Sequence, residues 1–369
     1  MKLAIHTISD DNNFGNRLQN FALQKVLNSR YGETKTLQDI DSKRNYYSII
    51  NEFSVARMTM PFNIIRLFLN GGTKSEFLRS IKEYSRQRVF RNFTKEYVPK
   101  FRKKNIGNQI DYFIIGSDQV WNPNFRRNLS KDFLPCVHDK KIISYAASVG
   151  LNKLSKSEEA IFRDGLKHLS AISVREYTAQ TLLGKIVDNE ITVLIDPTML
   201  VSADEWHELS ERANNEVKKQ KNFLVTYFLG KISINEKKYI NEYAQKNRLK
   251  IIDISDVSSR LYAKIGPLEF LWLFENAAAV FSDSFHAAVF SLIFQKYFEI
   301  FERHDTLPQM NTRMHTLFQH FSLEDRIRNV ESENGHLSEI DYERISNLIN
   351  IKRSEAFVWL DENLKESRT

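Results

Sequence analysis

Short runs of strand-forming residues alternate with helical patterns along most of the chain, and this alternation constrains the fold more than any other feature. It is typical of parallel sheets whose strands are joined by crossover helices. Strands are predicted at residues 2–8, 34–39, 112–115, 142–146, 172–175, 192–195, 223–228, 250–254, 279–282 and 297–301. The chain has 369 residues, whereas one domain usually holds about 100 to 200, so the sequence predicts two Rossmann-like α/β domains.

The pair Asp196-Pro197 interrupts regular structure, and the break between the two domains is predicted near residues 197–220. We therefore expect an N-terminal α/β domain over residues 1–200 and a C-terminal α/β domain over residues 201–340. Residues 341–369 contain apolar side chains at helical spacing and predict a final helix that packs across both domains. In such an arrangement a ligand binds in a cleft at the carboxyl ends of the two sets of strands.

A strongly basic stretch interrupts the N-terminal domain between residues 43 and 104. It holds fifteen lysine or arginine residues and four glutamates, a net charge of +11, whereas the whole chain carries +7. Its aromatic and aliphatic residues recur with helical spacing, so we predict a basic helical insertion that contacts anionic lipid headgroups. The alternative is a helical subdomain with a solvated basic face. Nucleic acid is not expected as a partner, because no recognised binding module accompanies the charge.

Several chemistries are disfavoured by what the sequence lacks. It has no Gly-x-Gly-x-x-Gly, Walker or Gly-x-Ser-x-Gly motif, so dinucleotide, ATP and hydrolase sites of those kinds are not expected. The nine histidines and Cys136 are not at metal-ligand spacing, so neither a metal nor a bound cofactor is predicted. The N-terminal residues do not resemble a signal peptide, and no apolar run approaches the ~20 residues that cross a bilayer. The sequence therefore predicts a cytoplasmic protein, at most peripheral at the inner membrane leaflet.

Two polar segments follow predicted strands in the N-terminal domain, where active-site residues of open α/β sheets collect. The first, residues 10–20, leads into a helix, and Gly15 with the amides of the first turn would bind an anion or a sugar hydroxyl. Its alternative role is a plain turn with an Asx cap. In the second, residues 116–123, Asp118 would orient or deprotonate a hydroxyl and Trp121 would stack on a sugar face. Alternatively, Ser117 or Asp118 caps a helix and Trp121 fills the core.

A third segment ends in an arginine. Arg175 comes at the end of a predicted strand, where its forked guanidinium would bind a carboxylate or a phosphate. The alternative is an ion pair with Glu176 or with another acid.

The fourth segment places a histidine at the start of a helix. A strand ends at Ser282, Asp283 or Ser284 caps the next helix, and His286 falls in its first turn. Free amides and the positive end of the helix dipole favour a phosphate at this position, beside an imidazole that can transfer a proton. The alternative is a histidine packed on the apolar face of the helix.

Taken together, these segments resemble the polysaccharide pyruvyl transferase family. The matching segments are residues 13–24 (NFGNRLQNFALQ), 116–123 (GSDQVWNP), 144–150 (SYAASVG), 173–176 (SVRE), 196–198 (DPT), 266–271 (GPLEFL) and 282–286 (SDSFH). Each segment alone is a weak signal, but all of them in order over most of the chain are a strong one. The resemblance implies a fold like that of GT-B glycosyltransferases, with the acceptor on the N-terminal domain and the donor on the C-terminal domain.

The resemblance also implies an activity. A pyruvyl group would pass from phosphoenolpyruvate to two hydroxyls of one sugar as a cyclic ketal, on a surface polysaccharide or its lipid-linked repeat unit, with release of phosphate. Arg175 and His286 match family residues linked to phosphoenolpyruvate binding. Many relatives have an arginine two residues before that histidine, where this chain has Ser284. Either the serine and the helix amides hold the anion, or Arg303 or Arg313 substitutes for that arginine, or the donor differs.

On this interpretation the candidate residues take separate roles. His286 is predicted to protonate the methylene carbon of the donor, and Asp118 to accept the proton of a sugar hydroxyl. Further predicted contacts are with the donor, through Arg175, Ser284, Asp283 and Ser282, and with the acceptor, through Asn13, Asn16, Arg17 and Trp121. No metal is required. The alternatives are a GT-B glycosyltransferase that uses a nucleotide sugar, and an inactive glycan-binding module.

Overall fold

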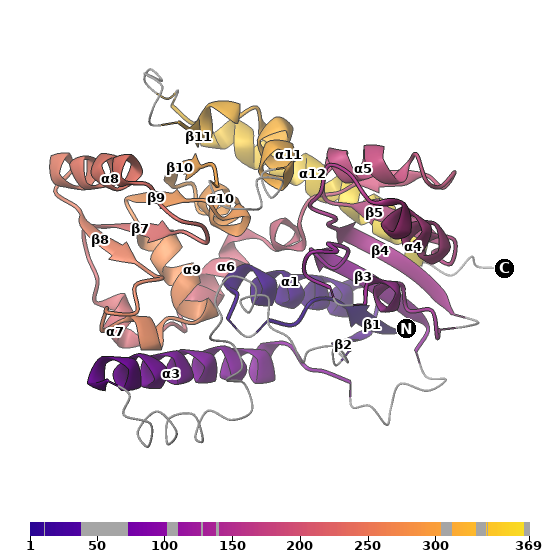
Figure 1. Cartoon of the computed structure of the whole chain (residues 1–369), viewed down its shortest axis with the longest axis horizontal. Helices are drawn as coiled ribbons and strands as arrows, with labels where there is room; N and C mark the ends of the chain where they lie inside the picture. The colour runs from indigo at the N-terminus through magenta and orange to yellow at the C-terminus, as the bar shows by residue number, and fades with distance from the viewer. Residues whose placement is uncertain are drawn as a thin grey trace.

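Two parallel sheets form the framework of the molecule (Figure 1). The computed structural model describes residues 1–10, 12–37, 73–101, 110–126, 128–137, 140–303, 312–329, 337 and 339–364. The first sheet, ordered β2-β1-β3-β4-β5-β6, consists of β1 (Lys2–His6), β2 (Glu33–Thr36), β3 (Tyr112–Asp118), β4 (Lys141–Ala147), β5 (Ala171–Val174) and β6 (Ile191–Val193). The second, ordered β11-β10-β9-β7-β8, consists of β7 (Phe223–Tyr227), β8 (Lys250–Asp253), β9 (Ala279–Ser282), β10 (Tyr297–Phe301) and β11 (Ile327–Arg328).

Both sheets follow the same strand order. The first strand of each lies between the second and the third, so β1 pairs with β3, with Leu3 opposite Tyr112, as β7 pairs with β9, with Leu224 opposite Ala279. The predicted α/β fold with two parallel sheets is confirmed, and every predicted strand is present within a few residues of its expected ends. β11 was not evident in the sequence, because a strand of two residues carries no period.

Helices cover the sheets and connect their strands (Figure 1). The helices are α1 (Phe14–Arg30), α3 (Lys74–Tyr97), α4 (Lys156–Leu166), α5 (Tyr177–Leu183), α6 (Ala203–Ser210), α7 (Asn215–Lys218), α8 (Ile234–Lys246), α9 (Pro267–Asn276), α10 (Phe285–Ile293), α11 (Thr312–Phe321) and α12 (Tyr342–Leu364). Short 3-10 helices are η4 (Leu129–Phe133), η5 (Pro197–Leu200), η6 (Tyr262–Lys264) and η8 (Glu324–Arg326).

The predicted final helix is α12, and it contacts both halves of the molecule. Near its start, the hydroxyl of Tyr342 donates to the carbonyl of Lys296, which precedes β10. Near its end, Asp361 accepts a hydrogen bond of 2.7 Å from the hydroxyl of Tyr31, which follows α1. The expectation that this helix packs across both α/β units is therefore confirmed.

One hydrophobic cluster joins the two sheets. Its buried members include Ile5 of β1, Phe14 of α1, Val225 of β7 and Phe270 of α9. The ring of Phe14 stacks on Phe270 with 4.9 Å between centroids, and Tyr227 meets its edge at 5.5 Å. α1 thus packs against the second sheet and its helices as well as against the first sheet.

α3 lies in the predicted basic insertion, between β2 and β3, yet it is bound to the C-terminal half. The Nζ of Lys82 donates to the carbonyls of residues 257, 258 and 259 at 2.9, 2.8 and 3.1 Å. Arg86 is buried, donates to the carbonyl of Ile254 at 2.9 Å, and lies over the ring of Tyr262. The predicted helix is therefore present, and Arg86 belongs to an interface rather than to a solvated basic face. Residues 43–72 and 102–104 of the basic segment lie outside the described residues.

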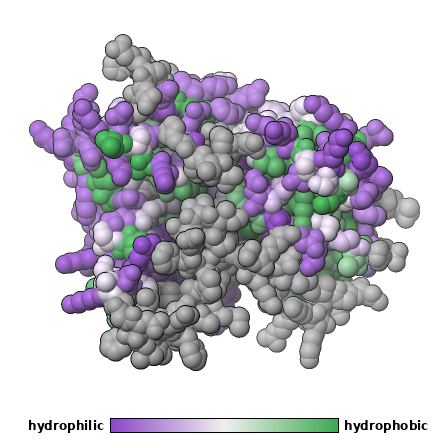
Figure 2. All heavy atoms as spheres, viewed as in Figure 1, coloured by the Kyte–Doolittle hydropathy of each residue, from purple (hydrophilic) through white to green (hydrophobic). Residues whose placement is uncertain are grey.

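The surface in view in Figure 2 is mainly hydrophilic over the described residues, with apolar side chains exposed in small groups. Within the described ranges, no helix has the length and hydrophobicity that crossing a membrane would need.

Candidate functional site

A pocket lies where the carboxyl ends of the two sheets meet. The β1–β3 and β7–β9 pairs are the positions at which strand order reverses, and open α/β sheets bind ligands at such positions. Both positions contribute to this pocket, together with segments after β10 and in α11. Its described lining consists of Ile8, Asp10, Asn13, Asn16, Asp118, Gln119, Leu229, Ser284, Phe285, His286, Arg303 and Arg313.

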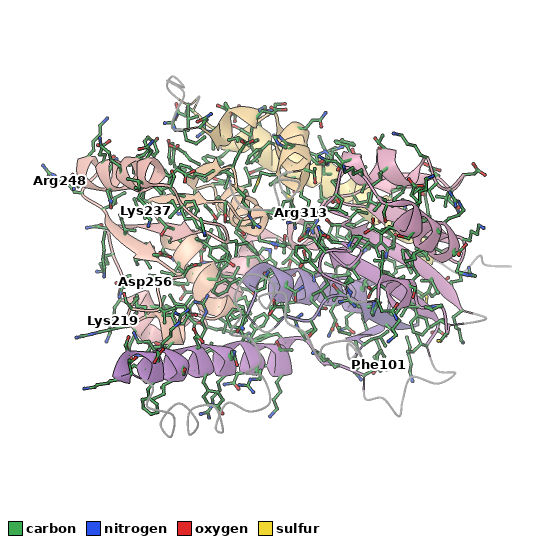
Figure 3. All side chains as sticks on the ribbon, viewed as in Figure 1. Phe101, Lys219, Lys237, Arg248, Asp256 and Arg313 are labelled. Carbon is green, nitrogen blue, oxygen red and sulfur yellow. The ribbon has the colours of Figure 1, made fainter. Side chains whose placement is uncertain are left out.

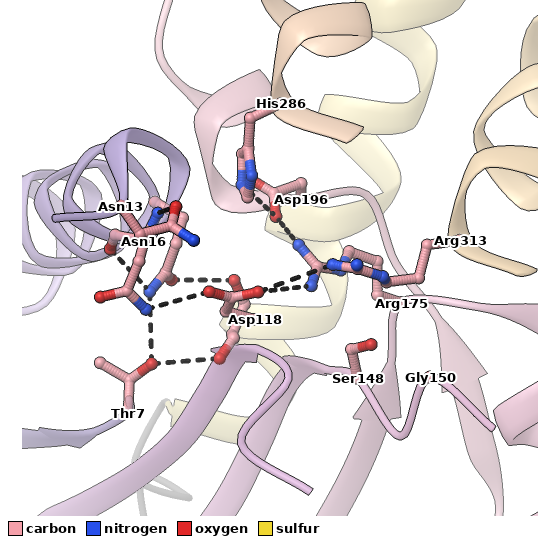
Figure 4. Close-up of polar contacts among 12 residues, drawn as sticks. Thr7, Asn13, Asn16, Asp118, Ser148, Gly150, Arg175, Asp196, His286 and Arg313 are labelled. Atoms are coloured by element: carbon pink, nitrogen blue, oxygen red, sulfur yellow. Dashed lines mark hydrogen bonds and ion pairs between the residues drawn. The ribbon is translucent and has the colours of Figure 1, made fainter. Parts of the chain in front are cut away.

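The start of α1 supplies two asparagines to the pocket. Asn13 caps the helix by accepting a hydrogen bond of 3.0 Å from the amide of Asn16. The Nδ2 of Asn16 donates to Asp118 at 2.9 Å (Figure 4). The Oδ1 of Asn16 accepts from Arg17 and from the amide of Asp10. Arg17 is fully buried and is absent from the described lining. The structure therefore places the predicted Asn13 and Asn16 at the pocket and Arg17 behind them, where it supports the turn.

Asp118 ends β3 in the left-handed region of the backbone, with φ of 59°. One carboxylate oxygen lies 3.2 Å from Arg175 and 3.7 Å from Arg313, and the other accepts from Asn16. Burial alone would raise the pKa of Asp118, but the charges of Arg175, His286 and Arg313 outweigh burial and lower the pKa below its usual value. In this arrangement Asp118 is a carboxylate and a weak base.

Arg175 bridges two carboxylates rather than facing the pocket. Its Nη1 donates to Asp196 and its Nη2 to Asp118, and it is not part of the described lining (Figure 4). Burial would lower the pKa of the guanidinium, but the two aspartates raise it. Glu176, which the sequence offered as its alternative partner, instead accepts hydrogen bonds from residues 148–150 at 2.8 to 3.0 Å.

Asp196 is the site residue that the sequence reasoning missed. It was interpreted only as a break in the chain, although the Asp-Pro-Thr segment belongs to the family resemblance. In the structure it accepts hydrogen bonds from the amide and the hydroxyl of Thr198 at 3.0 and 2.7 Å, pairs with Arg175, and lies 3.6 Å from the Nε2 of His286. Burial would raise the pKa of Asp196, but the charges of Arg175 and His286 hold it well below its usual value.

His286 reaches the pocket from the first turn of α10, where the sequence placed it. Its Nε2 faces Asp196, and the opposite side of its ring packs on Gly15 in the first turn of α1. A Cβ atom at position 15 would lie 2.0 Å from the Nδ1 of His286. Glycine is therefore needed for this approach, which brings the N-terminal ends of two helices together at the pocket.

The Gly15→Ala variant is expected to lose about 1 to 3 kcal/mol of stability, the usual cost of adding a methyl group to a closely packed site. The residues on either side of Gly15 are buried, so the main chain there has no room to shift. The ring of His286, which is nearest to the new Cβ, must therefore move. Denaturant unfolding measures the loss. Gly184→Ala is the matched control, because the nearest atom would lie 3.1 Å from the new Cβ and Gly184 is not part of the described pocket lining. Equal stability of the Gly15→Ala variant and the native chain would contradict the contact.

Of the three residues before α10, one lines the pocket and two support the backbone around it. Ser284 lines the pocket at the N-cap of the helix. Asp283 accepts hydrogen bonds from the amides of Leu229 and Gly230 at 2.7 and 2.6 Å and lies 3.3 Å from Arg303, while burial raises its pKa. The hydroxyl of Ser282 donates to a carbonyl of β7 and accepts from the amide of Ser284. Of the three predicted donor contacts here, the structure places Ser284 at the pocket and the other two beneath it.

Arg303 and Arg313 bring positive charge to the pocket, and sequence reasoning had named both only as substitutes. The guanidinium groups of Arg175 and Arg313 both lie over the ring of Phe285, at 4.7 and 5.7 Å from its centroid. Figure 3 shows Arg313 in the middle of the molecule, between the two α/β halves. With the first-turn amides of α10, these groups form a site suited to an anion. No cluster of metal-binding side chains occurs in the part of the chain that the structure describes.

Trp121 does not reach the pocket. Its indole is fully buried and stacks on Phe133 at 5.3 Å, with Phe162 at its edge. The structure therefore places this residue in the core of the first α/β unit, as the alternative interpretation of the sequence had it.

Comparison with known proteins identifies a matching sequence family. Residues 13–304 match the sequence profile described as Polysaccharide pyruvyl transferase. Among solved structures, the chain is similar to UDP-GlcNAc 2-epimerase from Methanocaldococcus jannaschii, with 13% identity, a TM-score of 0.47, and coverage of 100% of this chain and 94% of that one. It is also similar to a glycosyltransferase from Rickettsia africae ESF-5, with 10% identity, a TM-score of 0.43, and coverage of 99% of each chain. No curated protein sequence matches significantly.

Proposed function

The chain belongs to the polysaccharide pyruvyl transferase family, and from this premise we propose that it transfers a pyruvyl group from phosphoenolpyruvate to two hydroxyls of a sugar. The product is a cyclic ketal on a surface polysaccharide or its lipid-linked repeat unit, and inorganic phosphate is released. The observation that carries the proposal is the pocket itself, in which two arginines, a helix N-terminus and His286 surround a space reached by both domains.

The donor is a multiply charged anion, and the C-terminal side of the pocket supplies the matching charge. Arg303, Arg313 and the amides that follow Ser284 would hold its phosphate and carboxylate groups. In this scheme Arg313 takes the place of the arginine that many relatives carry at the position of Ser284. Arg175 does not contact the donor in this scheme; its guanidinium holds the carboxylates of Asp118 and Asp196 in position.

The chemistry needs an acid and then a base. His286 donates a proton to the methylene carbon of the donor, one sugar hydroxyl attacks the adjacent carbon, and the second hydroxyl displaces phosphate. The two hydroxyls release two protons: Asp118 takes the first and passes it to the departing phosphate, and the second returns to His286. Asp118 lines the same pocket as Arg313, and an anionic donor bound there would raise the pKa of this carboxylate by placing negative charge beside it.

The acceptor approaches from the N-terminal domain. Asn13 and Asn16 line that side of the pocket and present amide groups, which suit the hydroxyls of a saccharide. We place the reaction in the cytoplasm at the inner membrane leaflet, where a lipid-linked repeat unit would be available.

Replacing Arg313 with glutamine is expected to weaken phosphoenolpyruvate binding by about 10- to 100-fold, since one charge-assisted hydrogen bond contributes roughly 1.5 to 3 kcal/mol. Calorimetric titration measures the affinity. Arg248→Gln, an exposed arginine beyond α8, makes the same change in net charge and is expected to leave affinity unaltered (Figure 3).

The proposal itself is tested by incubating the native protein with phosphoenolpyruvate and saccharide acceptors. Acceptor-dependent release of phosphate, with a ketal on the sugar, is the expected result. Release of a nucleoside diphosphate from a nucleotide sugar would replace the proposal by a glycosyl transfer, and saccharide binding without turnover of either donor would indicate an inactive glycan-binding module.

A further inference from the structure

One face of α3 combines exposed apolar and basic side chains in a single row. Leu78, Ile81 and Tyr84 are 50, 37 and 38% exposed, and they follow one another at a spacing of three residues. Arg88, Arg91 and Lys95 are exposed and continue the row at spacings of three and four residues. Residues so spaced share one side of a helix. We call these six residues the outer stripe.

The opposite face of α3 is fixed to the rest of the protein. Phe90 and Phe93 are buried in the core there, and Lys82 and Arg86 bond the carbonyls that follow β8. α3 runs along the edge of the molecule beneath the C-terminal half in the view of Figure 1. The outer stripe is therefore held in a fixed direction, pointing away from the interface.

The charge of the outer stripe selects its partner. Three of its six members are basic and none is acidic. Of the glutamates on α3, Glu83 pairs with Arg79 at 3.0 Å and Glu76 closes the capping box at Thr73. Glu96, which is exposed after Lys95, interacts with Tyr97. A second copy of the chain would bring like charges together. A nucleic acid would match the bases but would leave the three apolar side chains in water.

We propose that the outer stripe of α3 docks on an anionic lipid surface. Leu78, Ile81 and Tyr84 enter the boundary between headgroups and acyl chains, while Arg88, Arg91 and Lys95 contact the phosphates. The proposal does not depend on the reaction in the pocket. It narrows the lipid contact expected from the basic segment to one face of one helix, and it excludes Arg86, which is buried.

The test measures sedimentation of the full chain with vesicles made of equal parts phosphatidylcholine and phosphatidylglycerol. The combined change Arg88→Gln, Arg91→Gln and Lys95→Gln is expected to lower partitioning by about 100-fold at low salt, because each base near an anionic surface contributes roughly a fivefold gain. Leu78→Gln with Ile81→Gln is expected to lower it by about tenfold or more through lost apolar burial. The matched control is the combined change Lys237→Gln, Lys238→Gln and Lys246→Gln, which removes the same charge from exposed positions on α8.

Undiminished binding of the control, with loss in both outer-stripe variants, supports the proposal. An equal loss of vesicle binding in the control would mean that net charge alone determines binding, and this would overturn the proposal. Absence of vesicle binding by the native chain at low ionic strength would also overturn it. A native dimer that the Leu78→Gln, Ile81→Gln variant abolishes would assign the stripe to a second copy instead. Phosphate release by the outer-stripe variants on a soluble acceptor separates this outcome from failure of the proposed reaction.

Discussion

Replacing His286 with asparagine is expected to lower turnover by about 10² to 10⁴, the usual contribution of a positioned acid or base. Asparagine keeps a polar side chain beside Asp196 but cannot donate a proton to carbon. The native imidazole lies 3.6 Å from Asp196 through Nε2, while its Nδ1 side packs on Gly15. The melting temperature is expected to stay nearly unchanged, because the buried carboxylate of Asp196 keeps its ion pair with Arg175.

Phosphate release under saturating phosphoenolpyruvate measures this effect, and thermal unfolding monitors the fold. His168→Asn, an exposed histidine beyond α4, is the matched control and should retain full activity. A fall in melting temperature that accounts for the lost activity would assign His286 to packing. That result would return the residue to the alternative that the sequence left open.

Replacing Asp196 with asparagine is expected to cost about 3 to 5 kcal/mol of stability at neutral pH, the usual effect of removing one partner of a buried ion pair. Arg175 would keep its charge, with the carboxylate of Asp118 as its remaining ion-pair partner. The folded-state pKa of Asp196 lies well below its usual value, so its contribution is complete above the unfolded pKa of about 4 and disappears as pH falls through the folded pKa.

The native chain should therefore lose stability as the medium is acidified below about pH 5, and the variant should show a weaker dependence in that range. Denaturant unfolding at a series of pH values tests this. Asp188→Asn, at an exposed position after α5, should change stability by less than about 0.5 kcal/mol and keep the native pH dependence. Parallel acid curves for native protein and the Asp196→Asn variant would mean that Asp196 does not stabilise the fold through its charge.

The fold could be predicted because its information is local. Strands buried on both faces, such as β3 and β9, appear as continuous apolar runs, and their alternation with helical periods predicts parallel sheets. The shared core was beyond this reasoning. Phe14 and Phe270 are apolar residues in separate helices, and nothing in either helix indicates that their rings stack on each other.

The site was predictable where a residue directly follows a strand. Asp118, Ser284 and His286 reach the pocket for that reason, since the topology alone brings such positions to the carboxyl edge. Side-chain pairing is not visible in this way. The motif that contains Arg175 predicted a contact with an anionic ligand. In the structure, Arg175 is instead bound to two carboxylates of the protein itself, 21 and 57 residues away in the sequence.

For Trp121, the local sequence could not determine whether the side chain is exposed or buried. A tryptophan after a strand can face solvent or core with the same local sequence, and here it fills the core beside Phe133. The Asp-Pro-Thr segment contains a signal for Asp196, because it combines a proline that interrupts the chain with a carboxylate that can form an ion pair.

The continuous core also bears on how such a protein can diversify. Phe14 belongs to the first α/β unit, and the rings of Tyr227 and Phe270 that enclose it belong to the second. A recombination event that exchanged one half with a relative would have to preserve the shape of this aromatic contact, or expose it to water. New acceptors are therefore expected to be acquired through substitutions around the pocket rim, with the two halves inherited together rather than shuffled as independent modules.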